Sequence, residues 1–304
     1  MPNKLSIGVA LAPAMAFSTV TVAEVRPFAR YVEELGLDAV FVPDHLEVPC
    51  LESMTTLAIV AAVTERIKLG FGVLVLPLRQ PAWVAKQVAT LQLLSGNRII
   101  LGVGVGGSMH GMAGWEATGT PYTERQRRTD AALALLPRLI VGDSVALDSG
   151  EELTLSPGAE VPPIWVGGDS EAALRRAVVY GSAWYTQAMV LPGEVARCAR
   201  RLAELSSEHG RPTPDVVVGA TALLGSDASP SVVDDFTAML ARGLGVPPEQ
   251  ARALPILGSA ARAAERLAEY ARVGASSVVL RVIGGDWRQQ CDLIAEARGL
   301  VGTI

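Results

Sequence analysis

The sequence predicts an α/β fold in which eight parallel strands alternate with helices and close into one (β/α)8 TIM barrel. Three observations support this prediction. Short apolar segments alternate with amphipathic helical segments along the whole chain, which is the pattern of a parallel sheet. Half of the 304 residues are hydrophobic and only 5% are aromatic, as expected for buried strands packed under helices. The length is ordinary for a single barrel domain that spans residues 1–304.

The eight predicted strands are short, mostly apolar segments. They lie at 5–11, 38–43, 67–74, 98–103, 163–166, 183–186, 215–223 and 277–282. The start of the first one, Lys4 followed by apolar residues up to Ala16, also fits a short signal peptide. We favour a strand, because a single lysine is a thin charged region and cleavage would remove a strand that the closed barrel requires.

A capping box predicts the start of the first helix. Thr21 and Glu24 have the spacing at which their side chains satisfy the unpaired amides of a first turn. Pro27 follows inside the helical stretch, and we expect a slight bend there. Three stretches interrupt the alternation and are predicted insertions, near 107–121, 144–160 and 226–257. The second of them is expected to form a short hairpin at 144–156.

Charge and cysteine usage exclude several classes of protein. The net charge of −5 and the pI near 5.4 argue against a nucleic-acid-binding surface. No apolar run approaches the length of a membrane helix. Cys50, Cys198 and Cys291 lie far apart without metal-ligand spacing, so neither a disulfide framework nor a metal site is predicted. This cysteine usage fits a reducing cytoplasm.

Polar residues follow the second predicted strand, at the barrel end where functional groups gather. The strand ends in Asp44-His45, and a histidine there can act as a general acid or base or can donate a hydrogen bond to a ring nitrogen. Alternatively, Asp44 only caps a turn and His45 only packs; the two residues alone do not decide between these interpretations. In the third strand, Gly72 lets a flat ring approach the backbone closely.

Two glycine-rich segments follow later strands. The run Gly102–Gly107 matches no phosphate-binding spacing and is a weak signal. Gly167 and Gly168 are a stronger one, because they precede a helix whose first amides and dipole favour an anion. Here too a simpler interpretation exists, in which Asp169 or Ser170 merely caps the helix. The charge of Asp169 would repel a phosphate unless the side chain points away.

Taken together, these segments resemble the luciferase-like monooxygenase family, and the branch that uses deazaflavin in particular. The resemblance extends over nearly the whole chain and depends on the order and spacing of several segments. They are 35–46, 64–70, 72–79, 85–87, 94–96, 102–106, 163–168, and 180–181 with Trp184.

The resemblance implies a cofactor, FMN or the deazaflavin coenzyme F420, at the C-terminal strand ends. His45 would lie near the reactive ring. Gly72, Val73 and Leu74 would form a bulge behind the ring, often through a non-proline cis peptide bond. Gly167 and Gly168 would receive the cofactor phosphate. The remaining cofactor-binding residues that we predict are Asp44, Gly104, Gly106, Ser170, Trp184 and Thr186.

The chain departs from the family's sugar-phosphate dehydrogenases. In those enzymes a glutamate that serves as the acid follows the glycine run, whereas this chain has Gly107. A sugar-phosphate reaction is therefore not expected. Met109, Met112 and Trp115 follow instead, and we expect them to line a pocket for an apolar organic molecule.

The resulting functional prediction is an F420-dependent oxidoreductase that transfers a hydride to or from a small organic substrate, with His45 as the catalytic residue. One alternative is an FMN-dependent monooxygenase that uses O2 and reduced flavin from a separate reductase. Another, from a different class, is a flavin-binding protein without catalysis. The family resemblance also suggests a homodimer.

Overall fold

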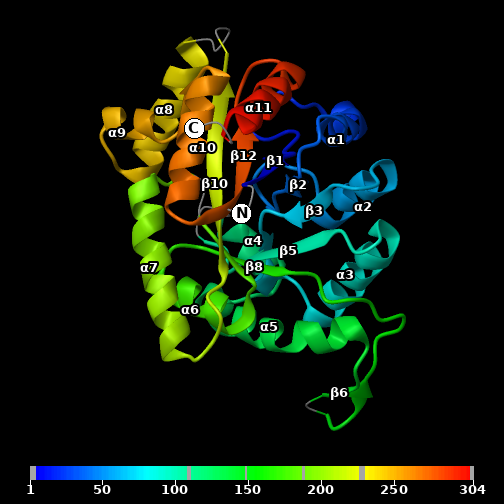
Figure 1. Cartoon of the computed structure of the whole chain (residues 1–304). Coiled ribbons are helices and arrows are strands. Elements are labelled where there is room, and N and C mark those ends of the chain that lie inside the picture. Colours follow the sequence, from blue (N-terminus) through cyan, green and yellow to red (C-terminus); the bar gives the residue numbers. More distant parts are fainter. Residues whose placement is uncertain (1–4, 108–110, 148, 187–188, 226–229, 302–304) are drawn as a thin grey trace.

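The computed structural model describes residues 5–107, 111–147, 149–186, 189–225 and 230–301. Eight parallel strands form a closed ring in the order β1-β2-β3-β5-β8-β9-β10-β12, and β12 pairs with β1 again (Figure 1). The strands are β1 Ser6–Ala10, β2 Ala39–Val42, β3 Lys68–Phe71, β5 Ile99–Gly104, β8 Ile164–Gly167, β9 Ala183–Tyr185, β10 Asp215–Leu224 and β12 Ala275–Val282. Each predicted segment overlaps one of them, with ends that differ by a few residues, so the predicted barrel is confirmed.

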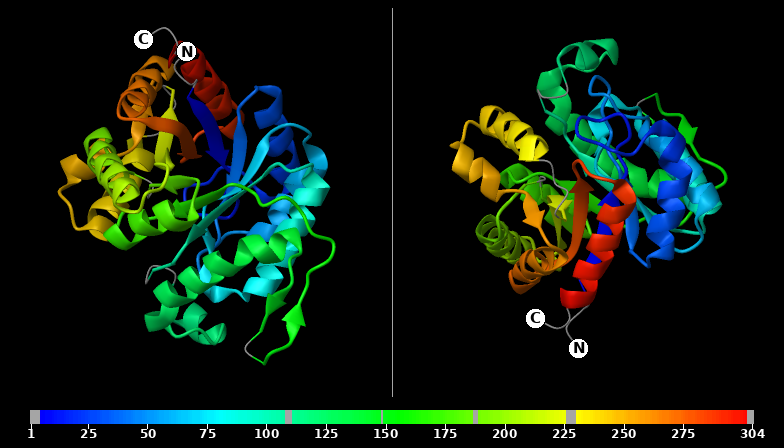
Figure 2. Two further views of the ribbon diagram at one scale, coloured as in Figure 1. Left: turned by 60° about the horizontal axis from the view of Figure 1, so that its bottom comes forward. Right: turned by 90° about the horizontal axis from the view of Figure 1, so that it is seen from above.

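Helices cover the outside of this ring (Figure 2). They are α1 Val25–Glu34, α2 Ser53–Val63, α3 Pro81–Ser95, α5 Arg125–Val141, α6 Glu171–Tyr180, α7 Pro192–Glu208, α10 Ala260–Arg272 and α11 Trp287–Val301. The larger apolar core lies between the ring and these helices, since alternate strand residues such as Val40, Leu101 and Val218 are fully buried in it. In the described part of the chain, no helix is long and apolar enough to cross a membrane.

Shorter elements interrupt the alternation. Helix α4 Ala113–Ala117 follows β5, and β6 Val145–Ala146 pairs with β7 Glu152–Leu153 as the expected antiparallel hairpin. Helices α8 Pro230–Leu244 and α9 Pro248–Ala253 lead into β11 Ile256–Gly258, which pairs with β10 outside the closed ring. The strands β4 Leu74–Val75 and β11 were not predicted as separate elements.

The first helix begins later than the spacing of Thr21 and Glu24 predicted. The capping box of Thr21 and Glu24 is present, and Glu24 also accepts a hydrogen bond from Trp287 Nε1 at 3.0 Å. However, these residues open a 3-10 turn, η1 Val22–Glu24, and α1 begins only at Val25. Pro27 therefore lies inside α1 as predicted, but in its first turn, where amides have no intrahelical partner.

Aromatic side chains fill the inside of the ring. Phe41 stacks on Trp165 with ring centroids 5.3 Å apart, and Tyr185 contacts both. Glycines on the neighbouring strands leave the space that Phe41 needs. A Cβ at Gly70 would lie 2.1 Å from Phe41 Cε1, and one at Gly8 would lie 2.9 Å from Cε2. The barrel interior beneath the C-terminal strand ends is thus filled by packed aromatic side chains.

The first and last parts of the chain close the ring together. The backbone amide of Ile7 donates to Asp38 Oδ2 at 2.7 Å, and Arg298 forms an ion pair with Asp38 Oδ1 at 3.0 Å. Tyr31 donates from its hydroxyl to Asp292 at 2.6 Å. These contacts hold α1 and the start of β2 against α11.

We expect Gly70→Ala to lower the thermal unfolding midpoint by an amount that corresponds to about 1–3 kcal/mol, because the added methyl group overlaps the buried Phe41 ring. Gly299→Ala is the matched control, since an added Cβ meets nothing within 4 Å in helix α11. The control should keep or raise the midpoint. Equal midpoints for the two variants would contradict this account of the barrel interior.

Candidate active site

The residues that could bind a cofactor or take part in catalysis lie at the C-terminal ends of neighbouring strands. Asp44 and His45 follow β2, the Gly72-Val73 peptide follows β3, and Gly167 ends β8. Because β2, β3, β5 and β8 are successive members of the ring, these residues form one side of the barrel mouth.

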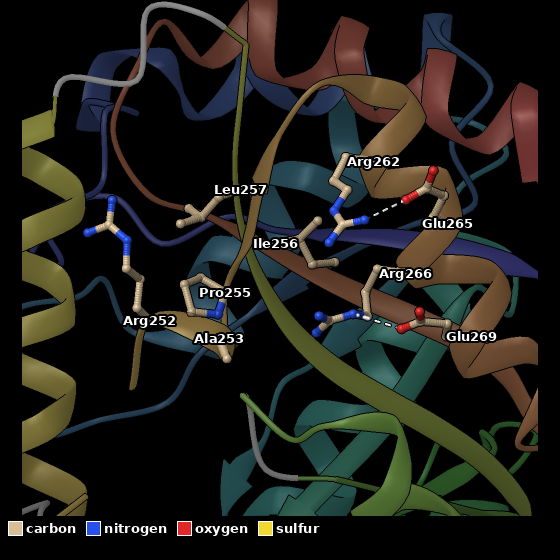
Figure 3. Close-up of a pocket in the computed structure, with 9 residues that line it drawn as sticks. All are labelled: Arg252, Ala253, Pro255, Ile256, Leu257, Arg262, Glu265, Arg266 and Glu269. Carbon is tan, nitrogen blue, oxygen red and sulfur yellow. Dashed lines mark hydrogen bonds and ion pairs between the residues drawn. The ribbon is translucent and has the colours of Figure 1, made fainter. Parts of the chain in front are cut away.

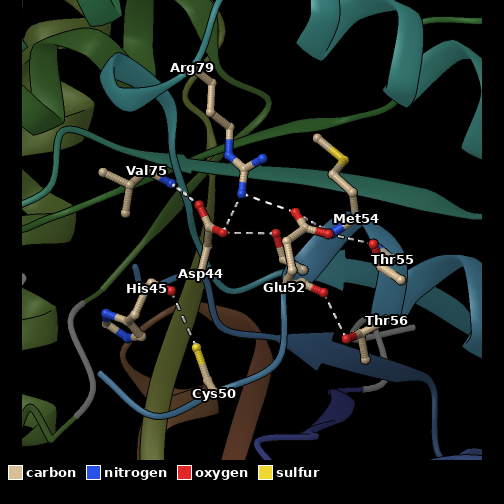
Figure 4. Close-up of polar contacts among 10 residues, drawn as sticks. Asp44, His45, Cys50, Glu52, Met54, Thr55, Thr56, Val75 and Arg79 are labelled. Carbon is tan, nitrogen blue, oxygen red and sulfur yellow. Dashed lines mark hydrogen bonds and ion pairs between the residues drawn. The ribbon is translucent and has the colours of Figure 1, made fainter. Parts of the chain in front are cut away.

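The carboxylate of Asp44 joins several of these segments (Figure 4). Oδ1 accepts hydrogen bonds from Ser53 Oγ at 2.9 Å and from Arg79 Nη2 at 2.6 Å, and Oδ2 accepts one from the Val75 amide at 3.0 Å. Asp44 is only 8% exposed. The end of β2 is thereby bound to the start of α2, to β4 and to the segment before α3.

Glu52 completes this arrangement. It accepts from Arg79 Nη2 at 3.1 Å and caps α2 by accepting from the amides of Met54 and Thr55. Burial acts to raise the pKa of Glu52, but these amide hydrogen bonds and the charge of Arg79 outweigh it, so the pKa lies below its usual value. Glu52 is therefore held as an anion beside the Arg79 guanidinium, which Asp44 also contacts.

His45 does not form a dyad with Asp44. Figure 4 shows the imidazole pointing away from the Asp44 carboxylate. The His45 carbonyl accepts from the Cys50 thiol at 3.6 Å, which fixes the backbone of the turn. The oxygens of Asp44 join distant segments of the protein, so these contacts match neither of the two interpretations left open by the sequence. The half-buried imidazole is directed elsewhere.

The bulge after β3 has the peptide geometry that the resemblance implied. The Gly72-Val73 bond is cis. The Val73 side chain occupies space left by three glycines on β5 and β8. A Cβ would lie 2.7 Å from Val73 Cγ2 at Gly104, and 3.3 and 3.2 Å from Cγ1 at Gly102 and Gly167, respectively. Gly106 similarly leaves room for Val75 and Trp115, since its Cβ would approach them to 2.7 and 2.9 Å.

These contacts give a physical reason for the glycine run that sequence reasoning missed. Residues 102 and 104 alternate along β5, so they face the same side, and Gly106 follows the strand with φ +68°. The protein itself fills the space at Gly104 and Gly106. The period-two spacing of the glycines was the available signal, and it indicated a close approach of the neighbouring strand.

A tight turn joins β8 to helix α6. Gly168 has φ +119°, donates from its amide to the Tyr185 carbonyl at 3.1 Å and accepts from Trp184 Nε1 at 2.7 Å. Ser170 caps α6 by accepting from the Ala173 amide at 3.2 Å. Trp184 is 1% exposed and lies in the core outside the ring, so it supports the turn from below. The half-exposed turn presents the N-terminus of α6 toward the barrel mouth.

Asp169 follows Gly168 in this turn and lies near helix α7. Together with Trp184, Thr186 and residues of α7, including Arg197, it lines a small cavity of about 60 Å³. The Thr186 hydroxyl accepts from the Gly219 amide at 3.0 Å. Two predicted cofactor-binding residues, Trp184 and Thr186, thus share this small cavity with Asp169.

Of the three residues predicted to line an apolar pocket, the structure describes two. Met109 lies outside the described residues. Met112 is 56% exposed, whereas Trp115 is 1% exposed and packs edge-on against Tyr122 at 5.1 Å. The buried Trp115 thus packs inward from α4, whereas Met112 is exposed to solvent, and the pocket stays a prediction.

A larger cavity of about 260 Å³ lies outside the ring, between α9, β11 and α10 (Figure 3). Four of its charged side chains pair with one another, Arg262 with Glu265 at 2.8 Å and Arg266 with Glu269 at 3.0 Å, and Arg252 pairs with Asp234 of α8. We assign no chemistry to this cavity. Within the described residues, no cluster of three or more His, Cys, Asp or Glu side chains is arranged to hold a metal ion.

The fold and comparisons with known proteins define this chain as a flavin- or deazaflavin-dependent oxidoreductase. It belongs to the luciferase-like monooxygenase family, whose sequence model matches residues 7–243.

An uncharacterised Mycobacterium tuberculosis protein is 31% identical over 216 residues, which are 62% of this chain and 73% of the relative. An F420-dependent glucose-6-phosphate dehydrogenase of Beutenbergia cavernae is 37% identical over 163 residues, which span 48% of this chain and less than half, 46%, of that relative. Among solved structures, an F420-dependent secondary alcohol dehydrogenase in complex with an F420-acetone adduct superimposes with a TM-score of 0.82. It has 17% identity, with 98% of this chain and 99% of that chain covered.

We expect Asp44→Asn to destabilise the protein by about 2–3 kcal/mol, because it removes the charge that compensates a partly buried Arg79. Asp234→Asn is the matched control, since its ion pair with Arg252 is exposed and should contribute under ~1 kcal/mol. Chemical denaturation of both variants measures the difference. Similar losses would show that Asp44 does not organise the strand ends.

Proposed function

We propose that this protein is an F420-dependent oxidoreductase that transfers a hydride to or from a small organic substrate at the barrel mouth. The observation that carries the proposal is the arrangement of the Gly72-Val73 bulge beside the turn at Gly167-Gly168, in a chain of this family. The match to F420-dependent glucose-6-phosphate dehydrogenases favours deazaflavin over FMN. Gly107 in place of the expected glutamate argues against their sugar-phosphate reaction.

The residues present fit such a cofactor. Gly72 is half-buried and carries no side chain, so a flat ring can lie against the bulge. The turn at Gly167-Gly168 and the N-terminus of α6 suit a phosphate, because the helix dipole and the first amides favour an anion. We assign Asp44 and Trp184 to positioning, since they form hydrogen bonds with protein groups.

When bound, the deazaflavin supplies a carbon that accepts or donates the hydride. The protein's part is to orient the reacting carbons, to exclude water and to move a proton. His45 is our candidate for the proton, because it follows β2 at the mouth and its imidazole is directed away from Asp44. The resemblance further supports a homodimer, and the three unpaired thiols fit a cytoplasmic enzyme.

Titration of the purified protein with F420 and with FMN, followed by fluorescence, tests the choice of cofactor. We expect saturable 1:1 binding of F420 at least tenfold tighter than that of FMN. Preferential FMN binding would favour the two-component monooxygenase, which requires a separate flavin reductase. Binding of neither would overturn the proposal.

Ser170→Asp separates helix capping from phosphate binding. Aspartate is as good a cap as serine, so α6 should remain stable, but the new charge would repel a phosphate at the turn. We expect cofactor affinity to fall about fivefold to thirtyfold, roughly 1–2 kcal/mol. Ser259→Asp, at the equivalent cap of α10, is the control and should leave affinity unchanged. Unchanged affinity in Ser170→Asp would place the phosphate elsewhere.

The role of His45 predicts a distinct kinetic pattern. We expect His45→Ala to lower turnover by roughly 10²–10⁴-fold, with much less effect on cofactor affinity. His45→Gln keeps hydrogen-bonding capacity but cannot transfer a proton, so its turnover should be as low as that of His45→Ala. Near-normal turnover in the alanine variant would exclude the role. Rescue by glutamine would make His45 a positioning residue.

A further inference from the structure

Two polar side chains face the inside of the barrel on the side opposite the glycine-rich strand ends. Alternate residues of β10 and β12 that belong to the outer core, such as Val218 and Val278, point to the helices, whereas Val217 and Val279 belong to the inner cluster. The same alternation places Thr221 and Arg281 inside the ring. Their Cα atoms are register partners on adjacent parallel strands, which lie about 4.8 Å apart.

The Arg281 guanidinium has no carboxylate to neutralise it among the described residues. Its single hydrogen bond there runs from Nη2 to the carbonyl of Ala16 at 2.8 Å. Burial lowers the pKa of Arg281, and no acidic group acts on it in the opposite direction. A guanidinium carries five N–H donors, so most of them remain for another acceptor. An uncompensated, half-buried charge of this kind costs stability.

Thr221 supplies a second, independent observation. Its side chain is 0% exposed, and within the described chain its hydroxyl has no hydrogen-bond partner. Buried hydroxyls are normally paired, so an unpaired one beside an unneutralised arginine requires an explanation. Hydroxyl and guanidinium groups together are donors that suit an oxyanion.

The surroundings strengthen any ion pair formed there. Leu223 and Ile283, the next inward-facing positions, belong to an apolar cluster with Phe236 and Phe17. On the other side, toward the N-terminal strand ends, Val279 belongs to the inner cluster with Phe41 and Tyr185. Low polarity on both sides increases the attraction between opposite charges and reduces competition from water.

We propose that Arg281 and Thr221 form a subsite for an oxyanionic group, a carboxylate or phosphate, of the substrate. This inference rests on the proposed function and names the substrate class for the same barrel mouth. In the ring, β10 and β12 lie opposite β3 and β5. A substrate anchored at Arg281 would therefore extend across the mouth toward the Gly72-Val73 bulge. The substrate would thus be an acid, in place of the apolar molecule expected from Met109, Met112 and Trp115.

Calorimetric titration of the cofactor-loaded protein with inorganic phosphate and with acetate, at constant ionic strength, tests the subsite. We expect one of these probes to bind 1:1, Arg281→Met to weaken it at least tenfold, and Thr221→Val to weaken it about fivefold, as for one lost hydrogen bond. Arg262→Met, which removes a surface arginine paired with Glu265, is the control and should bind normally. Equal binding by Arg281→Met and the control would overturn the proposal.

Two further measurements separate this subsite from other roles. If Arg281 and Thr221 serve ligand binding, Arg281→Met and Thr221→Val should keep or raise the thermal midpoint; a clear fall in both would indicate a structural role and overturn the proposal. Cofactor affinity should change less than twofold in both variants. A large loss would assign the subsite to an anionic group of the cofactor and also overturn it. If wild type binds neither cofactor, the proposed function fails, but titration of the cofactor-free protein still tests Arg281.

Discussion

The buried carboxylate of Asp44 is the interaction on which the candidate site depends. Its hydrogen bonds to Ser53, Val75 and Arg79 connect three segments that no strand pairing joins directly at this point. A buried anion is stable only when such donors surround it, so the geometry is specified as a unit. His45 and the Gly72-Val73 bulge flank this unit in sequence, and their relative position follows from it. A loop-borne site thereby acquires the rigidity of the barrel.

Close packing explains why so much of the fold was predictable. All eight strands were found, because buried parallel strands are apolar and helices of amphipathic period separate them. The capping box at Thr21 and the hairpin near 144–156 were also predicted correctly. Strand β11 escaped prediction because its few residues lie within a helical insertion. The start of α1 was placed before Val25 because a 3-10 turn and an α-helix share the same starting signals.

The candidate site was less accessible from the sequence. The glycines at 104 and 106 were assigned to a ligand, whereas the structure fills the adjacent space with Val73, Val75 and Trp115. The contacts of Val73 and Val75 join different strands, and the periodicity of a single segment does not reveal such contacts. Arg281 was overlooked for a different reason. Arginine is usually exposed, and the sequence does not show which face of its strand lies inside the barrel. The cis bond at Gly72-Val73 was expected from the family resemblance alone, since no local pattern specifies it.

The way the ring closes has a consequence for how the protein folds. Tyr31 and Asp292 are 261 positions apart, and Asp38 and Arg298 are 260 apart, yet both pairs lie at the junction of the first and last strands. Bringing such distant segments together carries a large loop-closure entropy, so this junction is expected to form late. Until β12 is in place, β1 and β10 each have one unpaired edge that is able to recruit strands from other chains. During synthesis, the risk of aggregation therefore persists almost to the last helix.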